Sequence, residues 1–224
     1  MATVVAFDVN ETLSDMRHLA PRLEKVGAPA QLFEAWFAAT LCDGFALTAA
    51  GGYANFAGVA SSALHAMLLG VETLTCTLDE AAAYVLAGIG ELPLHPDVEP
   101  AFARLHADGL RLVTLTNGSA ATTDELLHRG GVAQYVEQCF SVEEVHRWKP
   151  APEAYRYAAE RCGVNREDMT LVAVHPWDTD AAKRAGLGAA WINRRGVSFP
   201  EIFRQPDIIS SDLCEFAGSV SPHP

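Results

Sequence analysis

The stretch VVAFDVNETLSD, residues 4–15, is an apolar run that ends at Asp8 and continues at once into the polar residues Asn10 and Thr12. Four consecutive apolar residues are typical of a buried strand. An aspartate that follows a strand is most often a cap or a turn residue. The stretch alone is compatible with a structural and with a chemical role for Asp8.

The rest of the chain alternates between short apolar runs and amphipathic segments. The apolar runs predict further strands over residues 110–116, 171–174, 189–193 and 207–209. The amphipathic segments, each ending in glycine, predict helices over residues 97–109, 120–131, 151–163 and 178–186. This alternation indicates a parallel sheet with helices on both faces, an α/β fold of the Rossmann-like type.

Residues 15–95 interrupt this alternation, because they are helical in pattern and contain no convincing strand. The sequence therefore predicts an α/β core domain made of residues 1–14 and 96–224, with an all-helical cap domain, residues 15–95, inserted after the first strand. Ligands of open α/β sheets bind at the carboxyl ends of the strands. An insertion at that point is expected to cover such a site.

The charge balance excludes two classes of partner. Sixteen basic residues stand against 28 acidic residues, and the formal net charge of −12 repels nucleic-acid phosphates and anionic lipid surfaces. Residues 44–71 carry no charge, but Gly51-Gly52, Asn55 and His65 interrupt them too often for a membrane span. We interpret this stretch as two helices joined at the double glycine, with enough apolar surface to suggest a homodimer.

The five cysteines form no CxxC pair, so they indicate neither a zinc site nor a disulfide framework. Reduced thiols packed in the core of a cytoplasmic protein are the simplest interpretation. The first residues, MATVVAFDVN, lack the basic segment of a signal peptide.

Polar residues follow several of the predicted strands. Asp8 follows the first strand, the turn TNGS at 116–119 follows the second, and Asp178 follows a later one, while Lys149 precedes a helix. Taken singly, each has an ordinary structural explanation. Their order and spacing together predict an active site in which two carboxylates, a lysine and a hydroxyl-amide turn converge on one edge of the sheet.

Four ordered motifs resemble the haloacid dehalogenase superfamily, and within it the 2-haloacid dehalogenase (type II) branch. FDVNETL resembles FDxxGTL, LTNGS resembles LSNGS, SVEEVHRWKPAPEAY resembles SVDxVxxxKPxxxxY, and HPWDTDAAKRAG with AWINR resembles NxWDxxGAxxxG and xWxNR. The resemblance covers nearly the whole chain. It implies a hydrolase that acts on small molecules through a covalent aspartyl ester, and hydrolytic dehalogenation of a small 2-haloacid is the leading activity.

The resemblance also implies roles for single residues. Asp8 would be the nucleophile, with Lys149 holding it ionised. Thr12 would tie the loop after the first strand, Thr116 would orient the carboxylate or the substrate, and Asn117 would line the leaving-group side. Asp178 would interact with Lys149 and with the hydrolytic water. The expected substrate-binding residues are Val9, Asn10, Phe37, Leu41, Phe56 and Trp177. For Trp177, ordinary core packing is the alternative, and we interpret Tyr155 as a packing residue of its helix.

Departures from the superfamily patterns keep alternatives open. Magnesium-dependent phosphatases of the superfamily have a second aspartate where this chain has Asn10, and an extra metal-binding acid where it has Ala173. We therefore expect no metal and no cofactor, and magnesium would be needed only if the protein were a phosphatase. The dehalogenases typically have Tyr-Gly in place of Asn10-Glu11, and an arginine in place of Phe37. The alternatives are a phosphatase acting on a small phosphorylated metabolite, and a catalytically impaired protein that binds a ligand.

His175 stands where the dehalogenase branch has an asparagine. A group that titrates near neutrality suits general-base work on the ester or hydrogen bonding of a leaving group. The alternative is a neutral imidazole whose hydrogen bonds are satisfied by the fold.

Overall fold

The computed structural model of the chain describes residues 3–220, and these form two compact units. Residues up to 14 and from 94 onward make an α/β unit, and residues 15–93 make a helical unit. We describe each unit by itself.

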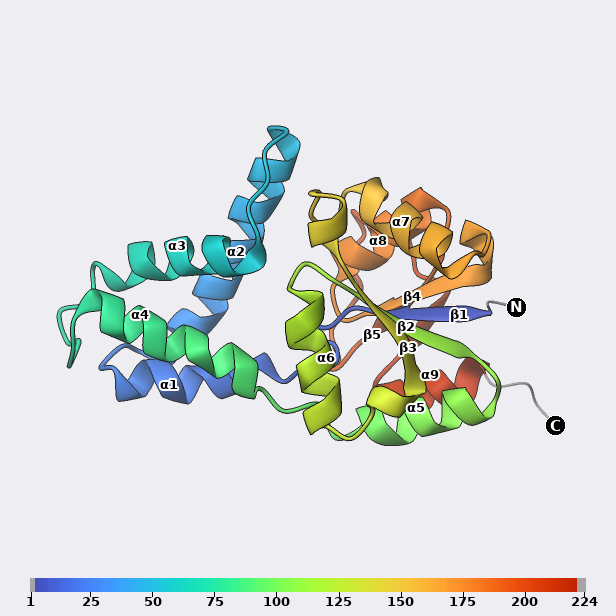
Figure 1. The fold of residues 1–224 in the computed structure, drawn as a ribbon, viewed down its shortest axis with the longest axis horizontal. Helices are drawn as coiled ribbons and strands as arrows, with labels where there is room; N and C mark the ends of the chain where they lie inside the picture. The colour runs from blue at the N-terminus through green and yellow to red at the C-terminus, as the bar shows by residue number, and fades with distance from the viewer. Residues whose placement is uncertain (1–2, 221–224) are drawn as a thin grey trace. The chain divides into compact units, whose positions relative to one another are not determined.

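The α/β unit is built on a six-stranded sheet with the strand order β3-β2-β1-β4-β5-β6, in which every neighbouring pair is parallel (Figure 1). Its strands are β1 (Val4–Phe7), β2 (Arg111–Thr116), β3 (Val136–Ser141), β4 (Met169–Ala173), β5 (Gly188–Ile192) and β6 (Ile208–Ser210). Its helices are α5 (Val98–Ala107), α6 (Ala120–Arg129), α7 (Pro152–Cys162), α8 (Pro176–Ala185) and α9 (Leu213–Val220). The predicted α/β class is confirmed.

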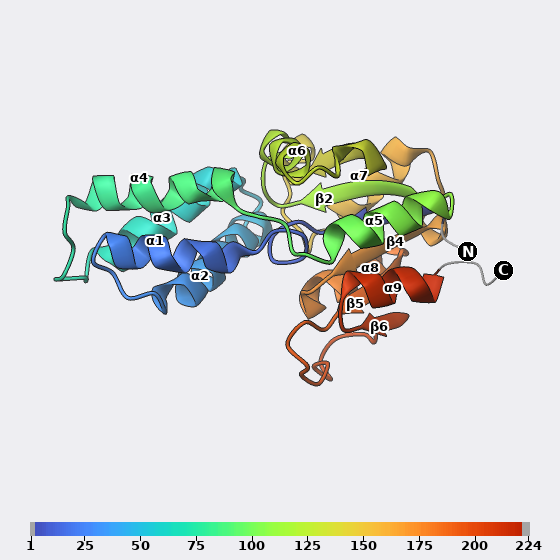
Figure 2. The same cartoon turned by 90° about the horizontal axis from the view of Figure 1, so that it is seen from below.

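Side chains of β1 alternate between two apolar cores, one on each face of the sheet. Val5 and Phe7 pack with Phe102 of α5 and Phe216 of α9. Figure 2 shows α5 and α9 side by side on that face. Val4 and Ala6 pack on the opposite face with apolar residues of α7 and α8. Because β1 is buried on both faces, its continuous apolar run is what a central parallel strand requires.

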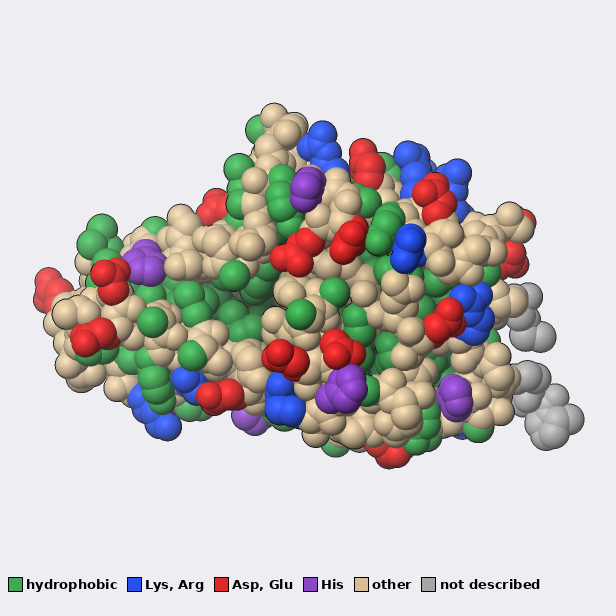
Figure 3. Space-filling model, viewed as in Figure 1, with side chains coloured by type: hydrophobic (Ala, Val, Ile, Leu, Met, Phe, Trp, Pro, Cys, Tyr) green, Lys and Arg blue, Asp and Glu red, His purple; other side chains and the backbone are tan. Residues whose placement is uncertain are grey.

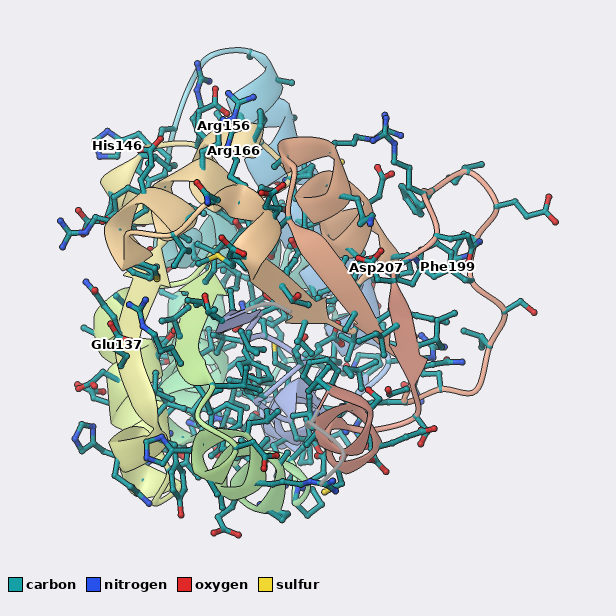
Figure 4. The ribbon with its side chains drawn as sticks, turned by 90° about the vertical axis from the view of Figure 1, so that its right-hand side faces the viewer. Glu137, His146, Arg156, Arg166, Phe199 and Asp207 are labelled. Carbon is teal, nitrogen blue, oxygen red and sulfur yellow. The ribbon has the colours of Figure 1, made fainter. Side chains whose placement is uncertain are left out.

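Two elements of the α/β unit were not predicted from the sequence. Strand β3 was missed because it lies at an edge of the sheet, where Glu137 and Gln138 are exposed and the apolar signal is weak. Figure 4 shows Glu137 at this edge and Asp207 near the opposite one. Helix α9 is short, and its buried face consists of only three residues, Leu213, Phe216 and Ala217.

The helical unit contains α1 (Ala20–Lys25), α2 (Leu32–Ala49), α3 (Phe56–Leu68) and α4 (Leu78–Ala87). The chain leaves α2 through Gly51, whose φ of +80° suits glycine, and enters α3 after the cap Asn55. Two helices joined at the double glycine were predicted, and this is confirmed. Short 3-10 helices occupy Met16–Leu19, Gly88–Glu91, Ala133–Tyr135, Val142–Glu144 and Arg166–Asp168.

Helix α2 is long and apolar enough to cross a membrane on length and composition, with a mean hydropathy of 1.2. Core helices of globular proteins can have the same length and apolar composition, so these two properties are weak support for a membrane span. Within the helical unit, the Trp36 Nε1 group of α2 donates to the Ala60 carbonyl of α3 at 2.9 Å. The indole is therefore satisfied by protein contacts.

All five cysteines are free thiols, but they do not all lie in the core. Cys162 is buried, whereas Cys42, Cys76 and Cys214 are exposed. The expectation that the thiols fill the core was therefore wrong for these three.

Candidate active site

Asp8 lies directly beyond the carboxyl end of the central strand β1. Its backbone N–H donates to the Val172 carbonyl of β4 at 3.0 Å, and its side chain is buried. The Thr12 hydroxyl donates to Asp8 Oδ2 at 2.7 Å and accepts from the Val174 N–H at 3.1 Å. Thr12 thus joins the loop after β1 to the end of β4 and fixes one oxygen of the carboxylate.

Lys149 is fully buried and connects the two carboxylates. Its Nζ donates to Asp8 Oδ1 at 2.7 Å, to Asp178 Oδ2 at 2.6 Å and to the Leu115 carbonyl at 2.9 Å. An ammonium group has three protons to donate. All three have an acceptor here, so the lysine is fixed in place and its charge is directed at the carboxylates.

The opposite charges in this cluster stabilise each other's ionised forms, which burial alone would disfavour. Burial on its own would raise the pKa of Asp8. The charges of Lys149 and His175, together with hydrogen bonds from Lys149 and Thr12, outweigh burial and hold that pKa below its usual value. Burial would lower the pKa of Lys149, but the two carboxylates raise it above its usual value. Asp8 is therefore an ionised carboxylate and Lys149 an ammonium at neutral pH.

Asp178 lies in the first turn of α8, and both its oxygens have donors. Oδ2 accepts from Lys149, and Oδ1 accepts from the Tyr155 hydroxyl at 2.5 Å. Burial, together with the like charge of Asp8, raises the pKa of Asp178. Burial and the neighbouring Asp178 raise the pKa of Tyr155 well above its usual value, so the phenol remains a donor.

Tyr155 is a site residue that sequence reasoning left among the packing residues. The pattern YRYAAERC is that of an ordinary amphipathic helix, and Tyr155 is indeed fully buried. The signal that could have identified it was the match of Tyr155 to the tyrosine of the KPxxxxY motif. Its hydroxyl reaches the carboxylate that pairs with Lys149.

Asn117 and Thr116 extend the support around Lys149. The Asn117 amide donates to the Lys149 carbonyl at 3.2 Å, and its Oδ1 accepts from the Lys149 N–H at 2.8 Å. Thr116 Oγ1 accepts from the Gly118 N–H at 2.9 Å and so shapes the turn after β2. Asn117 thus holds the backbone of Lys149. Contact of either residue with a substrate or a leaving group stays a prediction.

His175 lies near Asp8, and Trp177 stacks on its ring. The two rings stack with centroids 5.2 Å apart and planes inclined by 19°. His175 Nε2 lies 3.2 Å from the Asn10 carbonyl and 3.8 Å from Asp8 Oδ2. Val9 is buried beside Asp8, and its carbonyl accepts from the Leu13 N–H at 2.9 Å. The α/β unit therefore brings Val9, Asn10, His175 and Trp177 together around Asp8.

The remaining predicted substrate-binding residues belong to the helical unit. Phe37 and Leu41 lie on α2, and Phe56 begins α3. Phe37 is buried and stacks with Phe33, with ring centroids 6.4 Å apart. Contact of these three side chains with a substrate stays a prediction.

The donor set around Asp8 does not suit a divalent cation. Within residues 3–220, no group of three or more His, Cys, Asp or Glu side chains is arranged to hold a metal. Hard cations such as magnesium prefer several oxygen ligands. Here the Lys149 ammonium bridges Asp8 and Asp178, the two carboxylates that such an ion would need.

A parallel α/β sheet with an ionised, lysine-held aspartate at the carboxyl end of its central strand defines a class of protein: hydrolases with a carboxylate nucleophile. A family model described as haloacid dehalogenase-like hydrolase matches residues 2–186. The chain belongs to this family.

Similar proteins of known name agree with the family. The chain is 32% identical over 211 residues to haloacetate dehalogenase H-2 of Moraxella sp. (strain B), with 91% of each chain covered. It is 27% identical to an (S)-2-haloacid dehalogenase of Pseudomonas putida, with 95% of this chain and 94% of the relative covered. The fold matches an L-2-haloacid dehalogenase structure from Xanthobacter autotrophicus with chloropropionic acid covalently bound, with a TM-score of 0.88, 22% identity and 100% coverage of both chains.

Proposed function

We propose that this protein hydrolyses the carbon–halide bond of a small 2-haloacid through a covalent ester on Asp8, without a metal or a cofactor. The observation that carries the proposal is the state of Asp8, which is a buried and ionised carboxylate held by Lys149 and Thr12. A carboxylate of this kind can attack an electrophilic carbon directly.

In the first half-reaction, an Asp8 oxygen attacks the carbon that bears the halogen. A carbon–oxygen bond forms as the carbon–halide bond breaks, and the halide leaves with the bonding electron pair. Attack opposite the leaving group inverts the configuration of that carbon. Lys149, Thr12 and the end of β1 hold the carboxylate in one orientation, which reduces the entropy lost in the transition state.

In the second half-reaction, water attacks the carbonyl carbon of the ester. The bond between this carbon and the alkyl-bearing oxygen breaks, which releases a 2-hydroxyacid and restores the Asp8 carboxylate. The hydroxyl oxygen of the product thus comes from Asp8, and the oxygen of water enters the carboxylate.

Haloacetates are the first substrates to test, because the similar protein from Moraxella is a haloacetate dehalogenase. The (S)-2-haloacid dehalogenases among the relatives make chiral 2-chloropropionates the second choice. We propose that residues 15–95 act as a cap domain. The substrate contacts of Phe37, Leu41 and Phe56 belong to this proposal.

The decisive assay measures halide release from chloroacetate, bromoacetate and both enantiomers of 2-chloropropionate, with and without chelator. Phosphate release from small phosphate esters is measured in parallel with and without magnesium. We expect halide release that is unchanged by chelator, because Asn10 supplies no acid and Lys149 bridges the two carboxylates.

Magnesium-dependent phosphate release without any halide release would contradict the proposal and favour the phosphatase. Absence of both activities, despite a folded protein, would favour a catalytically impaired binding protein.

We also propose a cytoplasmic homodimer. The exposed thiols of Cys42, Cys76 and Cys214 suit a reducing compartment. The uncharged stretch 44–71 and the exposed Leu69 favour association through the helical unit. Figure 3 shows hydrophobic side chains gathered on the face of this unit that carries α3 and α4.

A further inference from the structure

Two residues that depart from the dehalogenase motifs lie next to each other. Glu11 stands at the glycine position of FDxxGTL, and His175 stands at the asparagine position of NxWDxxGAxxxG. In the fold, Glu11 Oε2 lies 3.6 Å from His175 Nε2. Glycine at position 11 and asparagine at position 175 could not form a carboxylate–imidazole pair, so the two departures together create one.

The backbone at Glu11 has a conformation that is unfavourable for residues other than glycine. Its φ is +63°, in the left-handed region that glycine adopts freely and other residues adopt at a cost of about 1–2 kcal/mol. The His95 ring holds the Glu11 carbonyl, with Nε2 at 3.1 Å from the oxygen. A strained non-glycine residue at a reacting centre is a recurrent sign of function.

The groups around His175 Nε2 indicate that this nitrogen carries a hydrogen. Near this nitrogen lie the Asn10 carbonyl oxygen at 3.2 Å, Glu11 Oε2 at 3.6 Å and Asp8 Oδ2 at 3.8 Å. All three are acceptors in the ionised enzyme, so Nε2 carries a hydrogen. Stacking on Trp177 fixes the plane of the ring, and the nitrogen remains directed at the nucleophile.

We propose that Glu11 and His175 form an acid–base pair that completes hydrolysis of the Asp8 ester, with His175 as a catalytic residue and Glu11 as its positioning residue. This inference rests on the proposed dehalogenase function. It assigns the pair to the second half-reaction, and not to attack on the haloacid.

The assignment follows from how charge changes at Asp8. Before reaction, both Asp8 and Glu11 present a carboxylate to Nε2. Formation of the ester neutralises Asp8, and Glu11 is then the nearby carboxylate that keeps the Nε2 hydrogen in place. The other donors are already engaged, because Lys149 donates to three acceptors and the Tyr155 hydroxyl is held by Asp178.

The oxygen of water forms a bond to the carbonyl carbon of the ester, and the bond from that carbon to Oδ2, which carries the alkyl group, breaks. His175 enters this step as the imidazolium, protonated on both ring nitrogens. Its Nε2 proton passes to the departing oxygen, which leaves as the hydroxyl group of the product, and the ring becomes a neutral imidazole. Of the two protons of the water, one returns to Nε2 and the other is lost to solvent, and Asp8 is again a carboxylate. Glu11 has 35% of its side chain exposed to solvent, against 13% for His175.

The test separates the two half-reactions. Wild type and the variants His175→Asn, Glu11→Gln and Glu11→Gly are mixed with bromoacetate, quenched in acid during steady turnover, and examined by intact-protein mass spectrometry. His128→Asn and Glu160→Gln are the matched controls, because both side chains are exposed on helices away from Asp8.

We expect steady turnover of His175→Asn to fall by about a hundredfold, the usual contribution of a general acid or base. The first-turnover burst of bromide should remain, and the ester should accumulate on most of the enzyme. Glu11→Gln should show the same accumulation to a smaller degree. Glu11→Gly should match Glu11→Gln although it relieves the backbone strain, because both variants remove the carboxylate.

If the variants lose the bromide burst and steady turnover in equal proportion and no ester accumulates, the pair does not act in the second half-reaction and the inference is overturned. Unchanged turnover in all three variants would overturn it as well. If wild type itself neither releases bromide nor forms an adduct, the proposed dehalogenase function fails, which is a distinguishable result.

Discussion

Asp8→Asn should abolish halide release from every 2-haloacid that the wild-type protein hydrolyses. The amide has no anionic oxygen, so no ester can form at the end of β1. Asparagine has nearly the same shape as aspartate, and its amide oxygen can still accept from one of the two present donors, Thr12 or Lys149. We therefore expect the variant to remain folded, as judged by circular dichroism and a thermal melt.

Halide release is the measurement for this variant, and Asp124→Asn is its control. Asp124 is an exposed aspartate on α6, with 59% of its side chain accessible. The control should retain wild-type turnover. Appreciable turnover by Asp8→Asn, beyond what slow deamidation back to aspartate supplies, would rule out Asp8 as the nucleophile.

Lys149→Met should reduce turnover by several orders of magnitude. The variant removes the ammonium that directs the Asp8 carboxylate, and a fixed charge at a reacting centre is worth about 3–4 kcal/mol or more. It also leaves two carboxylates buried without a cation, which costs roughly 3–5 kcal/mol of folding stability. Denaturant unfolding measures the stability loss, and Lys25→Met, a change at an exposed lysine of α1, is the control.

The same variant should also change the pH dependence of the residual activity. In the wild-type protein Lys149 helps to hold the pKa of Asp8 below its usual value against burial. Without the lysine, burial raises this pKa, so a smaller fraction of Asp8 is ionised at a given pH. The acidic limb of the pH–rate profile should therefore move to higher pH. A limb that stays in place would mean that Lys149 does not control ionisation of the nucleophile.

The sequence predicted most of the sheet, because central parallel strands are buried on both faces and therefore have continuous apolar runs. Strand β3 escaped the same reasoning, since an edge strand needs apolar residues on only part of its surface and Glu137 and Gln138 are exposed. Helix α9 escaped it because a helix of two turns has too few residues to display a period.

The candidate site shows a similar division. Asp8, Lys149 and Asp178 could be named because residues at the carboxyl ends of parallel strands must meet at one sheet edge. The contact of Tyr155 with Asp178 could not, because its spacing on α7 is also that of a core residue. The pairing of Glu11 with His175 depends on a left-handed turn that brings together loops 164 positions apart, and no local pattern indicates it.

The most direct test of the covalent mechanism is a single turnover in water labelled with heavy oxygen, with the enzyme in excess over bromoacetate. Ester formation on Asp8, followed by attack of water on its carbonyl carbon, places the label in the Asp8 carboxylate. The expected result is a heavier peptide containing Asp8 and an unlabelled hydroxyl group in the glycolate formed. Label in the glycolate hydroxyl with an unlabelled Asp8 peptide would contradict the mechanism, because water would then have attacked the substrate carbon directly.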